Sequence, residues 1–325
     1  MRARVRACCA AFVCCALGVP ALAHAEKSKI DPTVGYNYEE IETPRIAAMA
    51  GATRALSNSL EALFLNPANM AASRVYHIGG MAQIWPEAQR QSYGAGAMDS
   101  FGSKYQLAGG IGGTYNTQDS DGIARRWTDL RFALAYPLSQ DFFVGVGGRY
   151  LLLSQNGLGA FGVSPASGGL SGERIVRAIS FDAAATFQPM EGLSLSIVGS
   201  NLSDPGNGFQ PMSVAGGVGY GKDIFGVEAD VVGDFDSWSH DTARAMAGGE
   251  VLLGDHFPLR AGYRYDQGPN SHALSGGVGY IDRLFSADVA LRRTVTGDHV
   301  TTIVLGFTYH LESAGLDQTT GDGGF

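Results

Sequence analysis

Cysteine is confined to the first 25 residues of the sequence, at four positions between Cys8 and Cys15. The same stretch has three arginines, a short apolar run and a small-residue site, AHA, that ends at Ala25. This order predicts a cleaved signal peptide over residues 1–25, and the short run argues against a transmembrane helix. The expected mature chain therefore has no disulfide, no thiolate metal site and no cysteine nucleophile.

Positive charge and long apolar runs are also scarce. Of 23 basic and 31 acidic residues, the first 25 positions hold three arginines and no acid, so 20 basic and 31 acidic residues remain, a net charge of −11. A nucleic-acid-binding protein needs a basic face to neutralise phosphates, and this balance argues against such a function. Past residue 25, no apolar run approaches the roughly 18–20 residues that a membrane-spanning helix needs.

Glycine and hydrophobic residues, by contrast, are abundant. The sequence has 46 glycines and is 45% hydrophobic, while only 17% of its residues are charged. An antiparallel barrel in a bilayer explains this mixture, because alternate residues face lipid and small residues ease strand curvature. The predicted fold class is all-β, a transmembrane barrel of about 14 antiparallel strands.

From residue 75 onward, short segments of alternating polarity are separated by turn residues, as such a barrel requires. A soluble sandwich also alternates, and periodicity alone does not say which face is buried. The signal peptide, the even strand number and the aromatic ends of the apolar stripes favour the barrel. Short turns alternate with longer loops along the chain, which matches periplasmic turns and outer loops. The predicted strands are 75–85, 90–98, 104–116, 126–138, 142–155, 173–188, 193–203, 212–221, 223–235, 241–254, 257–267, 270–281, 283–294 and 299–311.

Residues 26–74 precede the barrel at 75–311 and do not alternate. Their Ala, Leu and Met spacing predicts short helices, and Asn66-Pro67-Ala68 predicts a helix stop and restart, because proline disfavours a helical residue before it. We expect this segment to fold into the barrel as a plug. Residues 312–325 are interpreted as a flexible tail.

The run MAGATRALSNSLEALFLNPANMA, with Asn66, Pro67 and Ala68, resembles the N-terminal hatch of FadL-type outer-membrane transporters of hydrophobic compounds. The hairpins of the C-terminal half are similar to those of the related PorV-type barrels. The FadL resemblance implies a plugged fourteen-stranded barrel and a wall gap at a kink in the third strand. Here that strand has glycine pairs, which either permit a bend or simply relieve crowding. They are Gly109, Gly110, Gly112 and Gly113.

If the apolar stripes face lipid, a mixed set of charged side chains faces the lumen. Two interpretations stay open: the set pairs across strands and with the plug, or Arg260 or Arg264 binds a carboxylate such as a fatty-acid head group. The predicted lumen residues are Asp129, Arg131, Arg149, Asp182, Glu228, Asp230, Arg244, Glu250, Arg260, Arg264, Asp288 and Arg292.

Enzyme and metal motifs are incomplete. The stretch 216–223 resembles a phosphate-binding loop, but Asp223 stands where Ser or Thr is required. Residues 118–122 resemble a calcium loop without its closing Glu. The loop 234–241 has three Asp and one His, which fit either a cation or an ordinary solvated loop. We find no catalytic constellation, and we expect no cofactor and no bound metal.

The sequence therefore predicts a barrel in the outer membrane of a Gram-negative cell, in contact with its lipid. Its expected function is the passive passage of a hydrophobic small-molecule ligand. The alternative is a PorV-like binding module whose outer loops, especially residues 156–172, hold exported proteins or a secretion machine.

Overall fold

The computed structural model describes residues 41–118, 124–156, 174–205, 210–238, 240–297 and 299–311. The predicted signal peptide, the first part of the predicted plug, the tail and nearly all of the loop 156–172 lie outside the described residues.

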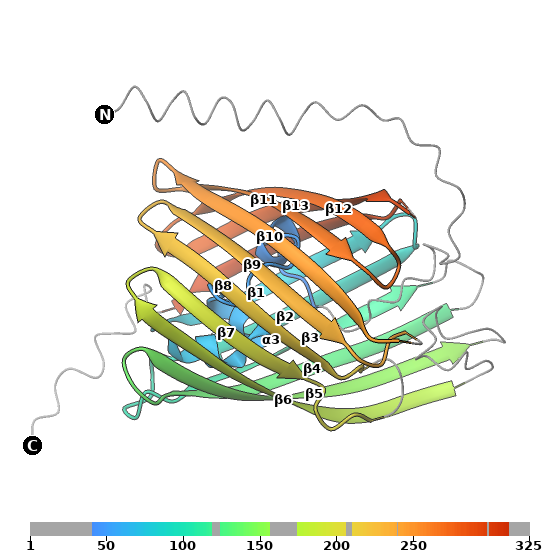
Figure 1. The fold of residues 1–325 in the computed structure, drawn as a ribbon, viewed down its shortest axis with the longest axis horizontal. Helices are drawn as coiled ribbons and strands as arrows, with labels where there is room; N and C mark the ends of the chain where they lie inside the picture. The colour runs from blue at the N-terminus through green and yellow to red at the C-terminus, as the bar shows by residue number, and fades with distance from the viewer. Residues whose placement is uncertain are drawn as a thin grey trace, which may run out of the picture.

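Fourteen antiparallel strands close into a single barrel, which confirms the predicted fold class (Figure 1). Each strand pairs with its neighbours in the chain, and β1 pairs with β14 from His77↔His310 to Ile84↔Ile303. The strands are β1 Tyr76–Trp85, β2 Arg90–Asp99, β3 Ala108–Gln118, β4 Ala124–Pro137, β5 Phe142–Asn156, β6 Arg174–Met190, β7 Leu193–Ser200, β8 Ser213–Lys222, β9 Phe225–Asp234, β10 Thr242–Leu253, β11 Phe257–Asp266, β12 Ser271–Ile281, β13 Phe285–Thr296 and β14 Thr301–His310.

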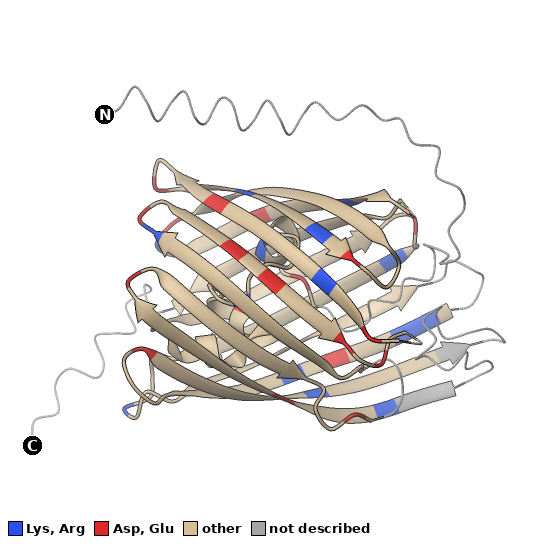
Figure 2. Cartoon of the chain, in the orientation of Figure 1, with Lys and Arg blue, Asp and Glu red and all other residues tan. Residues whose placement is uncertain are grey.

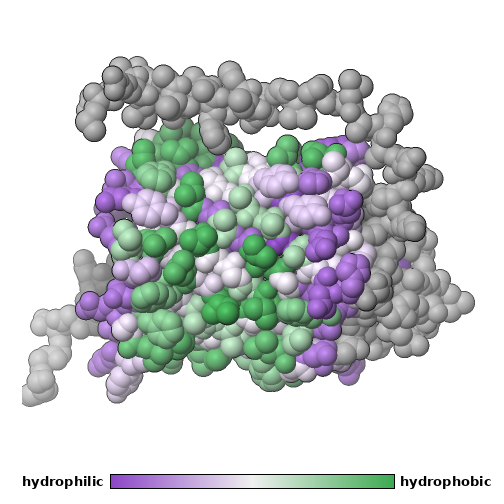
Figure 3. Space-filling model, in the orientation of Figure 1, coloured by the Kyte–Doolittle hydropathy of each residue, from purple (hydrophilic) through white to green (hydrophobic). Residues whose placement is uncertain are grey.

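The two faces of the barrel wall differ as a membrane barrel requires. On β9, Phe225, Val227 and Val231 are exposed on the outside, while Glu228 and Asp230 between them are buried inside. Figure 3 shows an apolar band over the strands with hydrophilic residues toward both ends. Figure 2 shows charged residues in the turns and also part-way along several strands. The outer face is thus apolar and the inner face polar, as in a barrel that spans a bilayer.

One end of the barrel carries mostly short turns, and we call it the short-turn end. Its connections are 100–107, 138–141, 191–192, 223–224, 254–256 and 282–284. Aromatic side chains cluster on the outer wall beside it: Tyr280 lies 5.6 Å from Phe257 and 5.7 Å from Phe285, whose ring stacks on Phe307. Such aromatic groups are typical of a membrane–water interface.

Inside the barrel lie three short helices, α2 Pro44–Ala48, α3 Ser59–Leu65 and the 3₁₀ helix η1 Pro67–Ala71 (Figure 1). Pro44 occupies the first turn of α2, where its missing N–H has no intrahelical partner to lose. Helix α3 ends at Leu65 because Asn66 is extended before Pro67, and η1 starts at that proline. Within the described residues, none of the helices is long and apolar enough to cross a membrane. We call residues 41–74 the plug, because they fill the barrel interior.

Candidate functional site in the plugged lumen

The Asn-Pro-Ala turn is fixed to the plug and to the wall by the side chain of Asn66, which is fully buried. Its Oδ1 accepts a hydrogen bond from the Ala68 N–H at 3.1 Å. Its Nδ2 donates to the Arg54 carbonyl at 2.6 Å and to Oγ1 of Thr186, on β6, at 2.9 Å. One amide side chain therefore caps η1, ties it to an earlier loop and attaches it to the barrel.

Asn69 adds a second attachment that the sequence motif did not single out. Its Nδ2 donates to the Arg54 carbonyl, the Ala55 carbonyl and Ser57 Oγ at 2.9–3.2 Å. Its Oδ1 accepts from Thr186 Oγ1 at 2.6 Å. The unit that anchors the plug is thus Asn-Pro-Ala-Asn, and the sequence signal for it is the second asparagine, one turn after the first.

Asn66→Ala is expected to destabilise the docked plug by about 1–3 kcal/mol, because it leaves the buried Arg54 carbonyl and Ala68 N–H with fewer partners. The matched control is Asn58→Ala, since exposed Asn58 precedes α3 without a side-chain capping bond. Protease protection of the plug is the measurement. Equal protection in the two variants would contradict the anchoring role of Asn66.

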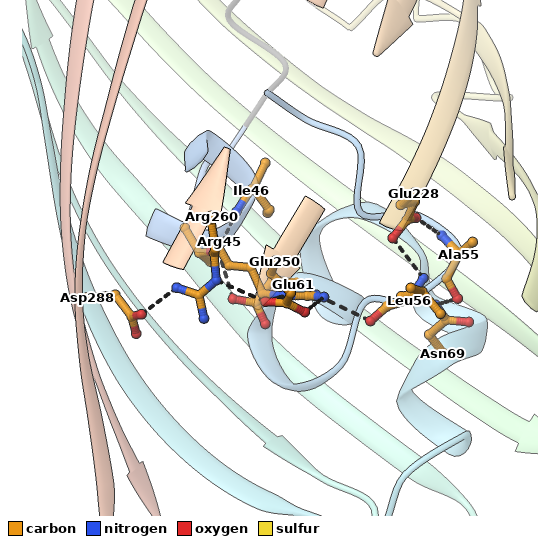
Figure 4. Close-up of polar contacts among 11 residues, drawn as sticks. Arg45, Ile46, Ala55, Leu56, Glu61, Asn69, Glu228, Glu250, Arg260 and Asp288 are labelled. Carbon is orange, nitrogen blue, oxygen red and sulfur yellow. Dashed lines mark hydrogen bonds and ion pairs between the residues drawn. The ribbon is translucent and has the colours of Figure 1, made fainter. Parts of the chain in front are cut away.

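Two carboxylates of β9 hold four consecutive backbone N–H groups of the plug. Asp230 Oδ2 accepts from the N–H groups of Thr53 and Arg54 at 3.1 Å each, and the Arg54 guanidinium lies 3.3 Å away. Glu228 accepts from the next two N–H groups, of Ala55 and Leu56 (Figure 4). Charge-assisted bonds to backbone N–H groups are among the stronger hydrogen bonds in proteins. We call this arrangement the carboxylate clamp.

A chain of ion pairs connects α2 to three strands. Arg45 Nη2 lies 2.6 Å from Glu250 Oε1, and the other oxygen of Glu250 is 3.0 Å from Arg260 Nε. Arg260 Nη1 then lies 2.5 Å from Asp288 Oδ1. Figure 4 shows these side chains converging below α2. Arg292 on β13 also pairs with Glu42 of the plug.

Five of the remaining predicted lumen residues form ion pairs within the wall. Asp129 accepts from Arg149 at 2.8 Å and from Arg131 at 3.2 Å, and Arg131 lies 4.0 Å from Asp182. Arg264 lies 3.6 Å from Asp266 on the same strand. Arg244 is buried on β10. The structure therefore brings most of the predicted charges together in two groups, one at the plug and one between β4, β5 and β6.

The opposite side of the plug is apolar. Leu60, Leu63 and Phe64 of α3 and Met70 of η1 pack against β1–β4. We call this contact the apolar seam. Its wall residues are Met81, Met98, Ala108, Ala133 and Ala135.

Glycines make room for this close packing. A Cβ on Gly110 would lie 3.1 Å from Leu63 Cδ1, and one on Gly112 would lie 3.0 Å from Phe64 Cζ. On β5, a Cβ on Gly145 would lie 2.4 Å from the Ala68 nitrogen. Strand β3 pairs in continuous register with β2 from residue 109 to residue 118 and with β4 from residue 108 to residue 118, so its glycines form no bulge. The lateral wall gap at Gly109, Gly110, Gly112 and Gly113 stays a prediction.

A cavity of about 530 Å³ lies at the short-turn end of the lumen, between the plug and β8–β14 and β1. Its lining includes the ion-pair chain, the turn 223–224 and apolar side chains such as Leu60, Met81 and Leu252. This volume is within the range of about 300–1,000 Å³ that small-molecule sites occupy.

Glu61 of α3 also faces the cavity and accepts from Thr43 Oγ1 at 2.8 Å. Burial within the barrel raises the pKa of Glu61 above its ordinary value, although Arg45 and the Thr43 hydroxyl oppose this. The folded state therefore favours the protonated acid. Its stabilising contribution is complete below the ordinary pKa of 4.5 and is lost as pH rises through the raised value.

Glu61→Gln is accordingly expected to make the free energy of unfolding less dependent on pH, because glutamine keeps a neutral acceptor toward Thr43. The thermal unfolding midpoint of both proteins, followed from about pH 4 to about pH 8, measures this. Parallel curves for the two proteins over that range would contradict the assignment.

In the loop 234–241, two aspartates accept hydrogen bonds from backbone N–H groups. Asp234 Oδ1 accepts from the N–H groups of Asp236 and Ser237, and Asp236 Oδ2 accepts from the Met212 N–H. Among the described residues, no cluster of three or more His, Cys, Asp or Glu side chains is placed to hold a metal ion.

Comparison with protein-family models gives no match, and neither does comparison with curated proteins. Solved structures do match. The CymD monoaromatic hydrocarbon channel is 17% identical with a TM-score of 0.62, over 82% of this chain and 96% of that one. The Ralstonia pickettii toluene transporter TbuX is 15% identical with a TM-score of 0.62, over 85% of this chain and 100% of that one. A Pseudomonas aeruginosa FadL homologue is 14% identical with a TM-score of 0.61, over 82% of this chain and 98% of that one. The chain therefore has the fold of the FadL-type outer-membrane channels.

Proposed function

We propose that this protein is an outer-membrane channel for the passive transport of hydrophobic small molecules. The observation that carries the proposal is the asymmetry of the plug. On the β9–β13 side it is held by the carboxylate clamp and by ion pairs, whereas on the β1–β4 side it packs through the apolar seam.

The two sides differ in how readily a hydrophobic molecule replaces their contacts. Leu63, Phe64 and Met70 make van der Waals contacts, and a hydrophobic guest offers equivalent contacts in exchange. Arg45 and Arg54 would instead lose buried anionic partners, which is costly. Entry along the apolar seam therefore needs no broken ion pair, and the plug stays attached while the guest passes.

The fold supports the same function by analogy. Two of the similar solved structures are a monoaromatic hydrocarbon channel and a toluene transporter. Because one fold hosts many functions, the structural similarity is supporting evidence only, and the asymmetric contacts of the plug carry the proposal. The protein-binding alternative depends on the loop 156–172, and it stays a prediction.

The test is uptake of radiolabelled toluene by Gram-negative cells that carry the chain in their outer membrane, compared with cells that carry an empty vector. We expect faster uptake that survives dissipation of the proton gradient, because the proposed passage is passive. Uptake equal to that of the empty-vector cells, at verified outer-membrane expression, would exclude the proposed transport.

A further inference from the structure

Two apolar residues belong both to the apolar seam and to the lining of the cavity at the short-turn end. They are Leu60 of α3 and Met81 of β1. The seam and the cavity therefore meet at these side chains. Methionine is unbranched, so the side chain of Met81 can adapt to an irregular guest.

Leu60 packs closely against the wall where the seam meets the cavity. Its Cδ1 lies 2.8 Å from the position that a Cβ on Gly79 would take, and its Cδ2 lies 3.1 Å from the corresponding position on Gly96. The preceding residue is fixed to the wall, because Ser59 Oγ lies 2.6 Å from His77 Nδ1. Rotation of the Leu60 side chain can thus open the contact while the start of α3 stays in place.

The charges of the cavity disfavour an anionic guest. Arg45 donates to Glu250 and to the Leu56 carbonyl, and Arg260 donates to Glu250 and to Asp288. Glu61 and, at the turn before β9, Lys222 and Asp223 also line the cavity, so its acids and bases are nearly balanced. A carboxylate entering here would have to compete with the acids that already pair with the two arginines. Apolar side chains complete the lining.

We propose that the cavity is a binding site for an uncharged hydrophobic molecule, which enters it from the apolar seam past Leu60. The inference rests on the proposed transport function and gives that transport an exit at the short-turn end. This exit is distinct from the predicted wall gap at β3, where Gly110 and Gly112 lie against plug side chains and the strand ladder is continuous.

A direct test uses 3-trifluoromethyl-3-phenyldiazirine, an uncharged aromatic photolabel, on the purified full chain. We expect covalent label at cavity residues such as Met81 and Leu252, mapped by mass spectrometry of the peptides. Toluene should compete with this labelling, and benzoate, which is similar in size and charged, should not. Label found only on the outer wall, or equal competition by benzoate, would overturn the proposal.

The route is tested by Leu60→Trp, which fills the contact between seam and cavity. Labelling of the cavity and uptake of toluene should both fall by about tenfold, the scale on which apolar pockets respond to added bulk. The matched control is Leu65→Trp, on the same helix and outside the cavity lining. If Leu60→Trp fails to fold, Leu60→Ala serves instead. The smaller side chain should raise both the labelling of the cavity and the uptake of toluene.

The outcomes separate the two proposals. Wild-type uptake no faster than the empty vector would defeat the proposed transport itself. Wild-type uptake above the vector, with both Leu60 variants indistinguishable from the wild type, would overturn the route past Leu60 and leave the transport function standing.

Discussion

Asp230→Asn is expected to release the plug from β9 while the barrel stays closed. Asn keeps the size of Asp230 but removes the charge that serves two backbone N–H groups and the Arg54 guanidinium. Because Arg54 is buried, the loss of its anionic partner should cost about 3–5 kcal/mol in plug docking.

Trypsin cleavage after Arg54 measures this effect, because that bond is protected while the plug is docked. The control is Asp223→Asn, the same chemical change on an exposed residue of the turn before β9. Barrel integrity is checked by the electrophoretic mobility shift on heating. Equal cleavage rates in the two variants would show that the carboxylate clamp does not hold the plug.

Gly145→Ala is expected to prevent the plug from docking. The docked plug should be destabilised by about 3 kcal/mol or more, the upper end of the range for overpacking. The added Cβ would lie 2.4 Å from the Ala68 nitrogen and 2.5 Å from the Pro67 carbonyl carbon. Both are backbone atoms, so no side-chain rotation relieves the collision. The Asn-Pro-Ala turn would have to move away from β5.

Gly147→Ala is the matched control, two residues along the same strand. Its Cβ would meet Asp182 Cβ and Oδ2 and the Phe132 carbonyl oxygen at 3.5 Å, an ordinary van der Waals contact. Protease protection of the plug should be lost only in Gly145→Ala. If both variants keep the plug protected, the close approach of the turn to β5 is not a determinant of docking.

The strands were predictable because their signals are local. Alternation such as that of Phe225, Val227 and Val231 against Glu228 and Asp230 has a period of two, and it needs no knowledge of partners. Turn residues then mark the ends. The closed barrel follows from the number of strands and their antiparallel succession.

The contacts of the plug were not predictable in the same way. Arg45 and Glu250 are 205 residues apart, and which acid meets which base depends on strand register and on the position of the plug. The Asn66 and Asn69 side chains reach Thr186, a threonine with no local signal of its own. From the sequence, the β3 glycines permit a bend or relieve crowding within the wall, whereas in the structure Gly110 and Gly112 lie directly against the plug.

The sequence separation of the plug contacts sets an order of assembly. Glu42 meets Arg292 across 250 residues, and Arg45 meets Glu250 across 205. The plug is made first, yet its partners on β9–β13 are among the last strands to emerge. Such non-local contacts form late, because the intervening chain must be ordered before they do. Formation of these ion pairs and closure of β1 on β14 therefore belong to the same final stage of folding, and an unfinished barrel lacks the β9–β13 anchors of its plug.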